Sequence, residues 1–294
     1  MTRPTAAAPI TDILLQADAR GEPLGPAGVT FLVRRYAATG ADEIRDVLER
    51  GLTTALDRAR AGGRWDVDWV HTLCEAAAVA EDERIADAAA AAALSLRDEW
   101  PCRDGIADAA RSVDACLTAA VFAGDRLSGR IEAQARDLIA AAVDELERVI
   151  CIAYHPGEML PRSLRSPDEA DGGVVEHVAA ATALLTAYAL TARLPYSMLA
   201  EELIQPVMVV GGPEGPHYVE RCGVATRCAL ARALCRLARL HDDDEYRRAA
   251  VMANARDYRA EAAALLDGMT AAHLDSSENA AIVGVALDEL ARAS

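Results

Sequence analysis

Hydrophobic positions recur at intervals of three and four residues along almost the whole chain, and good helix formers fill the positions between them. This period matches one face of an α-helix, whereas the strict alternation of a strand is nearly absent. We therefore predict an all-α protein, and the pattern also allows a short helix near 10–19. The predicted helices span 27–38, 42–61, 66–80, 83–99, 106–122, 126–152, 174–192, 196–208, 218–240, 244–267 and 277–292.

The links between these helices alternate in kind. Short links such as ATGAD, AEDE and LHDDD follow the first, third and later odd-numbered helices. Longer links rich in Gly and Pro, such as AGGRWD and YHPGEMLPRSLRSPDEADGG, follow the even-numbered ones. Short links join helices that pack side by side in opposite directions. The chain is therefore predicted to form helical hairpins with tight turns at one end and long loops at the other.

The tight turns share a sequence pattern. In RRYAATGADEIRDVLERGL, EAAAVAEDERIADAAAAAAL and CRLARLHDDDEYRRAAVMAN, an apolar helix end is followed by an acidic turn and then by Ile44, Ile85 or Tyr246. The first two of these positions lie about 41 residues apart, a spacing typical of arrays of helical hairpins. A single hairpin cannot bury its apolar face, so the hairpins are predicted to stack on one another.

The repeated pattern consists of a helix, a turn like TGD, and a second helix with an early Tyr or Ile and a later Ala. This pattern resembles the repeat of the six-hairpin glycosidase-like superfamily. The stretch FLVRRYAATGADEIRDVLERGLTTAL is also similar to the helical part of bacterial thioredoxin-domain proteins that carry such a repeat. The resemblance runs from Phe31 onward. It implies a single carbohydrate-active domain that spans 1–294 and folds as an (α/α)5-6 toroid. Residues 1–24 are expected to be partly irregular. An open α-solenoid is the alternative, because eleven helices complete the last hairpin only if the amino-terminal segment supplies a partner.

The resemblance also implies that the helix before each tight turn lines the inside, so that its start and the long loops surround the mouth of a cavity. Helix amino termini carry free N–H groups and a partial positive charge, which suits such a site. The candidate catalytic residues are the acids and histidines Asp68, His71, Asp114, Glu176 and His177. The candidate ligand-binding residues are Trp65, Asp66, Trp69, Arg111, His155, Tyr218, Arg221 and Glu278. The competing interpretation is that acids in a first helical turn only stabilise the helix, by about 0.3–1 kcal/mol each.

The segment RWDVDWVHTLCEA is the richest in chemistry. Asp68, His71 and Cys74 follow one another at spacings of three on one helix, but three ligands on a single helix drift around its axis and rarely converge on one ion. We therefore predict no metal site and favour an acid/base pair, formed by Asp68 with His71 or with Asp114. The arginines at 232, 236 and 239 share one helix face and are expected to form a solvated stripe paired with acids.

Composition excludes several function classes. The 294 residues contain 30 Lys+Arg, every one of them arginine, against 46 Asp+Glu, a net charge of −16. Without lysine there is no Schiff base and no phosphate-loop lysine, and no cofactor is predicted. An acidic chain without a basic block argues against nucleic acid as a partner.

Segment patterns and cysteine usage bear on location. The apolar stretch 178–192 is shorter than the roughly 20 residues that span a bilayer, so it is predicted to be a buried helix and no membrane partner is expected. The amino terminus lacks the apolar core of a signal peptide. Seven cysteines without a pairing pattern fit a reducing cytoplasm. The oligomeric state is left open.

Two functions agree with these features of the sequence. The first is an acid/base enzyme, a hydrolase or an isomerase, acting on a small sugar-like ligand in the central cavity. Only 3 Trp, 7 Tyr and 2 Phe are available for stacking on sugar rings, which argues for a narrow pocket rather than a polysaccharide cleft. The second is a non-catalytic helical-repeat protein that binds a partner or an apolar ligand. The lining of the cavity is the observation that discriminates between them.

Overall fold

The computed structural model describes residues 7–60, 66–80, 82–126, 129–166, 172–209, 222–250, 256–267, 269, 274 and 276–293. In these ranges the protein is all-helical, as predicted, with one isolated bridge between Gly105 and Ser163. The helices are α1 (Ala7–Ala19), α2 (Pro26–Thr39), α3 (Asp42–Arg60), α4 (Val67–Ala80), α5 (Glu83–Asp98), α6 (Ile106–Arg126), α7 (Gly129–Ala153), α8 (Val174–Thr191), α9 (Leu194–Val209), α10 (Val224–His241), α11 (Asp244–Ala249), α12 (Tyr258–Asp267) and α13 (Ser277–Arg292). A short 3-10 helix, Trp100–Cys102, follows α5.

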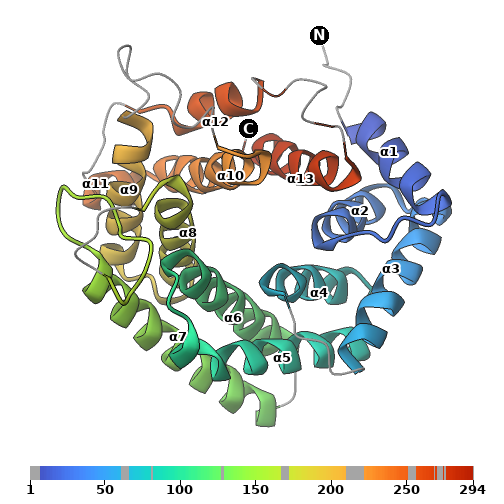
Figure 1. Cartoon of the computed structure of the whole chain (residues 1–294), viewed down its shortest axis with the longest axis horizontal. Coiled ribbons are helices and arrows are strands. Elements are labelled where there is room, and N and C mark those ends of the chain that lie inside the picture. The colour runs from blue at the N-terminus through green and yellow to red at the C-terminus, as the bar shows by residue number, and fades with distance from the viewer. Residues whose placement is uncertain are drawn as a thin grey trace.

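The helices form two layers. Figure 1 shows α2, α4, α6, α8, α10 and α13 around a central space, with the other helices outside them. Each inner helix contacts the next in that order, and α13 also contacts α2. The inner contacts therefore run around the whole layer rather than ending at the first and last hairpins.

The predicted hairpin pairs are confirmed by the packing of the two layers. The helix before each tight turn packs against the helix after it, as in α2 with α3, α4 with α5, α6 with α7 and α8 with α9. Helix α1 packs against α13 from the outside. The amino-terminal segment thus supplies a partner for the last inner helix.

The largest difference from the predicted helices is at 244–267, which the sequence pattern predicts as one helix. The structure has α11 and α12 instead. Helix α11 ends at Ala250, whose backbone leaves the helical region at φ −112° and ψ 82°. Helix α12 begins after Asp257, whose side chain accepts a hydrogen bond from the backbone N–H of Ala260 at 2.9 Å. An aspartate cap of this kind favours a new helix start over continuation of the old helix.

Side-chain contacts between inner helices repeat at nearly constant sequence separation. Thr30 bonds to Thr72 at 2.9 Å, Arg34 to Glu75 at 2.6 Å, and Arg111 to Asp68 at 3.5 Å, with separations of 42, 41 and 43 residues. These separations match the repeat length predicted from the tight turns. Because the two contacts between α2 and α4 advance together along both helices, these helices run in the same direction. Their amino termini therefore lie at one end of the central space.

Helix α8 is mostly buried. Among the described residues it is the one helix that is long and apolar enough to cross a membrane, judged by length and composition, and 61% of that stretch is buried inside the protein. Ala180, Ala181 and Ala183 have no exposed surface. Small side chains let neighbouring helices approach closely, which accounts for the abundance of alanine in a two-layer helical protein. The packing agrees with the prediction of a buried helix.

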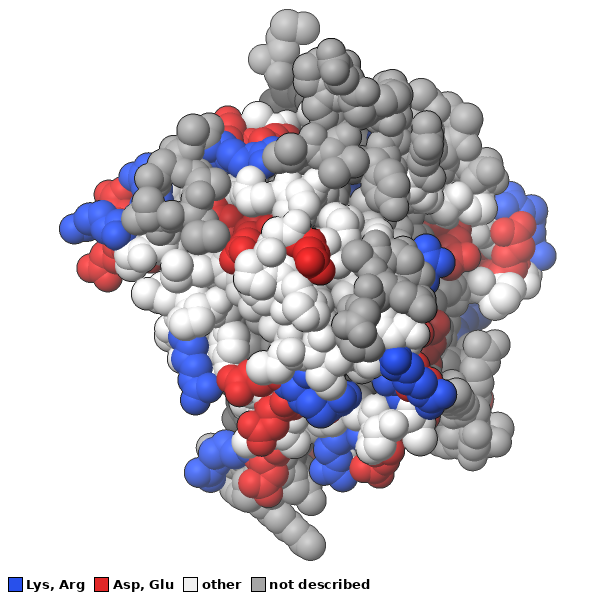
Figure 2. All heavy atoms as spheres, turned by 60° about the vertical axis from the view of Figure 1, so that its left-hand side comes forward, with Lys and Arg blue, Asp and Glu red and all other residues white. Residues whose placement is uncertain are grey.

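Figure 2 shows one outer face, on which arginines and acidic residues are interspersed. Many of the surface charges form pairs, such as Arg148 with Glu145 at 2.7 Å and Arg259 with Asp242 at 2.7 Å. Pairs of this kind contribute about 0–1 kcal/mol each. The outer layer is thus held mainly by its packing on the inner helices.

Candidate functional site

A pocket of about 300 Å³ lies in the central space and is lined by residues from all six inner helices. Half of the lining side chains are apolar or small, and most of the others are charged. The charged and histidine residues of the lining are Asp68, His71, Glu75, Arg111, Asp114, Arg232, Arg236 and Glu289. A small molecule in this pocket would therefore contact carboxylates, guanidinium groups and an imidazole together.

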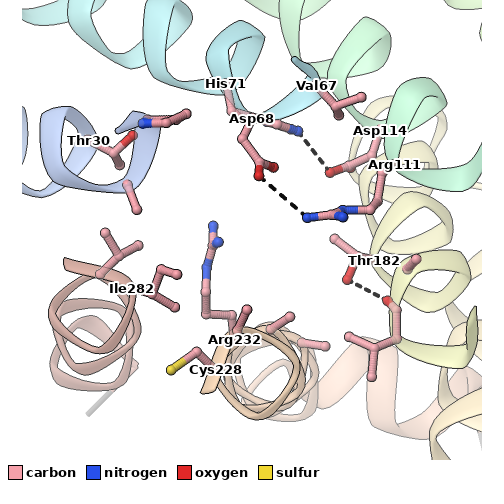
Figure 3. Close-up of a pocket in the computed structure, with 18 of the residues that line it drawn as sticks. Thr30, Val67, Asp68, His71, Arg111, Asp114, Thr182, Cys228, Arg232 and Ile282 are labelled. Carbon is pink, nitrogen blue, oxygen red and sulfur yellow. Dashed lines mark hydrogen bonds and ion pairs between the residues drawn. The ribbon is translucent and has the colours of Figure 1, made fainter. Parts of the chain in front are cut away.

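Two contacts join α4 to α6 at the pocket wall. Asp68 Oδ2 lies 3.5 Å from Arg111 Nη2, and one turn further along both helices His71 Nε2 lies 3.3 Å from Asp114 Oδ2 (Figure 3). Residues three apart share a helix face, so the sequence spacing places both pairs toward the pocket. Asp68 and Arg111 are about half exposed, and the His71 side chain is 30% exposed. The structure thus brings together four of the predicted site residues.

Asp114 is buried and fully engaged. Burial by itself would raise the pKa of this carboxyl, but contact with the His71 ring, the charges of His71 and Arg236 and the hydroxyl of Thr186 lower the pKa to about 2. Thr186 donates its hydroxyl proton to Asp114 Oδ1. Asp114 is therefore ionised at neutral pH, and it fixes the orientation of the His71 ring.

Arg236 supports this carboxylate from α10. Its guanidinium donates to the hydroxyl of Thr186 at 2.9 Å and to the backbone carbonyl of Thr182 at 3.2 Å. Burial lowers the pKa of Arg236, and the charges of Asp114 and Glu289 partly offset this. The expectation that residues 232, 236 and 239 form a solvated stripe is wrong for Arg236. The helical period places them on one face, but only the neighbouring helices decide that this part of the face lines the central pocket.

A second ionic cluster lies deeper along the inner helices. Arg34 donates to Glu75 at 2.6 Å and 2.8 Å and contacts Glu289 at 3.3 Å, and Arg232 donates to Glu289 at 2.9 Å. The Arg34 side chain is only 8% exposed. Burial would lower its pKa, but Glu75, Glu289 and Asp288 raise it above its ordinary value. Sequence reasoning missed this cluster, because its members lie on α2, α4, α10 and α13 and only tertiary packing brings them together.

Glu176 and His177 are engaged in structural contacts outside the pocket lining. Glu176 accepts a hydrogen bond from the backbone N–H of Gly173 at 2.8 Å, which caps the start of α8. His177 has no exposed surface; its Nε2 accepts from the Leu160 N–H at 2.9 Å and its Nδ1 lies 2.8 Å from the Leu203 carbonyl. Burial lowers the pKa of His177, and the hydrogen bond to the Leu203 carbonyl and the charge of Glu176 offset part of this effect. These contacts hold the ring neutral and anchor the loop before α8.

Other predicted site residues also lie off the lining. The side chain of Asp66 accepts a hydrogen bond from the backbone N–H of Asp68 at 3.3 Å. Trp69 packs against the core, and His155 and Glu278 are exposed. Trp65, Tyr218 and Arg221 lie outside the described residues. The helix-capping interpretation therefore accounts for Asp66, as it does for Glu176.

The described residues of the site include no cluster of metal-binding side chains and no Phe, Tyr or Trp in the lining. Among the described residues, no group of three or more His, Cys, Asp and Glu side chains is arranged to hold a metal ion. Cys74 is buried in the core, where burial raises the pKa of its thiol to about 12. The described lining contains no aromatic side chain. Sugar recognition by ring stacking therefore has no support among these residues.

The lowered pKa of Asp114 predicts an acid-dependent loss of stability. The carboxyl titrates near 3.8 when unfolded and near 2 when folded, so its full contribution is present above about pH 4 and is lost as the pH falls toward 2. A shift of this size corresponds to about 2 kcal/mol. Urea unfolding of the wild type and of Asp114→Asn should show a stability difference that shrinks by about this amount between pH 6 and pH 2. A difference independent of pH would contradict the assigned contacts.

Comparisons with protein-family models, curated proteins and solved structures find no match for this chain.

Proposed function

We propose that the chain is a cytoplasmic (α/α)6 toroid of the six-hairpin glycosidase-like type. Three observations support this: the inner helices contact one another in cyclic order, their side-chain contacts repeat every 41 to 43 residues, and α1 packs on α13 as the outer helix of the sixth hairpin. The buried cysteines Cys74, Cys116, Cys228 and Cys235 are free thiols, which agrees with a reducing compartment.

We further propose that the protein is an acid/base enzyme, a hydrolase or an isomerase, acting on a small sugar-sized polar molecule in the central pocket. The observation that carries this proposal is the contact of His71 with the buried Asp114 at the pocket wall. Nε2 of His71 donates to the Asp114 carboxylate, which leaves Nδ1 as the ring nitrogen that can exchange a proton with a ligand. A positioned imidazole of this kind is the commonest general base in enzymes.

The two carboxylates open to the pocket complete the acid/base chemistry. Asp68 lies one turn before His71 on the same helix face, with a side chain 53% exposed, and Glu75 lies one turn after it, with a side chain 35% exposed. Hydrolysis requires one group to donate a proton to the leaving oxygen and another to activate water, and isomerisation requires a proton to be removed and returned. His71 with one of these carboxylates supplies both roles, while Asp114 acts as a positioning residue.

The test is turnover of a panel of aldoses, ketoses and nitrophenyl glycosides by the wild type, His71→Gln and Asp68→Asn. We expect each substitution to reduce kcat/KM by about 100-fold or more, because general acid/base groups contribute 10² to 10⁴ in rate. Asp42→Asn is the matched control, since this acid is 80% exposed on α3, outside the pocket. An unchanged rate in His71→Gln would remove the acid/base proposal.

One observation favours the second function, a non-catalytic protein that binds an apolar ligand. Early positions of α8, α10 and α13 that line the pocket are apolar, including Val175, Val178, Ala225 and Ile282, and Val175 is 43% exposed. A binding protein of this kind would retain full ligand affinity in His71→Gln and would show no turnover of any panel substrate.

A further inference from the structure

Two arginines project into the pocket from different helices. Arg111 lies on α6 and Arg232 on α10, and Figure 3 shows both guanidinium groups pointing into the space that Asp68 also faces. Their side chains are 50% and 46% exposed. Both groups are therefore accessible to a molecule inside the pocket.

Arg111 and Arg232 use fewer of their hydrogen-bond donors than Arg34 and Arg236, the other two arginines near the pocket. A guanidinium has five N–H donors. Among the described residues, Arg111 contacts only Asp68, at 3.5 Å, and Arg232 bonds only through Nε to Glu289, at 2.9 Å. Arg34, by contrast, donates from all three of its nitrogens to two carboxylates. The terminal nitrogens of Arg232 and most donors of Arg111 thus remain available to a ligand.

The acids around these arginines use only a few of their donors. Glu75 is engaged by Arg34, and Asp114 is held by His71, Thr186 and Arg236. Glu289 is shared between Arg34 and Nε of Arg232, which leaves the terminal nitrogens of Arg232 without an acid partner among the described residues. Asp68 is the acid that contacts Arg111 among the described residues, and their 3.5 Å contact is long for an ionic hydrogen bond. The apolar part of the lining also strengthens electrostatic attraction within the pocket.

We propose that Arg111 and Arg232 form an oxyanion subsite, so that the ligand of the pocket is an organic anion bearing a carboxylate or a phosphate group. The planar fork of a guanidinium matches the two oxygens of either group. Arg111 contacts Asp68, which lies one turn from His71 on α4, so the bound anion holds the rest of the molecule beside the acid/base groups. This inference rests on the proposed function, because it names the substrate class of the same pocket.

The test is calorimetric titration with three probes of one carbon skeleton: sorbitol, gluconate and sorbitol 6-phosphate. We expect at least one anion to bind the wild type tenfold or more tighter than sorbitol, with affinity that falls as salt is added. Arg111→Gln and Arg232→Gln should each weaken anion binding at least tenfold and leave sorbitol binding unchanged. The matched control is Arg148→Gln, a surface arginine on α7 paired with Glu145. The preferred anion identifies the carboxylate or the phosphate as the group recognised.

Equal affinity for sorbitol and for both anions, absence of anion binding, or anion binding that survives in both variants would overturn the subsite. Circular dichroism checks the fold, and Arg111→Lys and Arg232→Lys, which keep the charge but lose the fork, replace any glutamine variant that does not fold. The two proposals fail separately. Arginine-dependent anion binding without His71-dependent turnover supports the subsite and refutes the enzyme. Turnover that depends on His71 but not on either arginine supports the enzyme and refutes the subsite.

Discussion

Replacing Phe31 with alanine should lower the free energy of unfolding by about 3–5 kcal/mol, the usual loss for a large aromatic side chain removed from a packed core. Phe31 lies on α2 and is 1% exposed. Its ring lies against Gly284 of α13, since a Cβ added at that glycine would be 2.7 Å from two ring carbons. The substitution therefore removes the packing between the first and the last inner helices.

Gly284→Ala provides a double-mutant test of the same contact. On its own it should destabilise the protein by about 1–3 kcal/mol, because the added methyl group collides with the ring. In the Phe31→Ala background the methyl group enters the space left by the ring, so the second substitution should be neutral or stabilising. Urea unfolding of the four proteins should give a coupling free energy of 1 kcal/mol or more. Simple additivity would mean that α2 and α13 do not pack together, as in an open solenoid.

Replacing Arg236 with methionine should lower the free energy of unfolding by about 3 kcal/mol. Arg236 compensates the charge of the buried Asp114 through its own charge and through the Thr186 hydroxyl that both contact. Loss of the compensation of a buried charge typically costs about 3–5 kcal/mol. The lower end applies here because Asp114 keeps its contacts with His71 and Thr186. The loss should shrink at low pH, where Asp114 is protonated and needs no counter-charge.

Arg239→Met is the matched control for this prediction. Arg239 lies on the same helix, three residues further along, and is exposed, so its replacement should change stability by less than about 0.5 kcal/mol. Both variants are measured by urea unfolding at pH 7 and pH 2. Equal effects of the two substitutions would show that Arg236 does not stabilise the carboxylate at the pocket wall.

Local sequence patterns predicted the helices well and their interruption poorly. Apolar periodicity and the tight acidic turns predicted the all-α fold and the hairpin pairs, because both depend on residues within one or two helical turns. The break at Ala250 was missed, since the helical pattern continues across it and the cap at Asp257 is a single side-chain contact. The 41-residue repeat predicted an array of stacked hairpins, and contacts between α2 and α4 recur at nearly the same separation.

For the candidate site, the sequence determined which residues share one face of a helix. The tertiary structure decided which of these faces line the pocket. The spacing of Asp68 and His71, and of Arg111 and Asp114, placed each pair on one face of its helix whatever the surroundings. Glu176 and His177 also lie at the start of an inner helix, yet capping and backbone contacts engage them away from the pocket.

The helical period alone could not distinguish Arg236, turned toward the buried Asp114, from the exposed Arg239. Which face of a helix lines a cavity depends on helices distant in the chain. Those contacts are set by packing of the whole inner layer, and no local pattern encodes them.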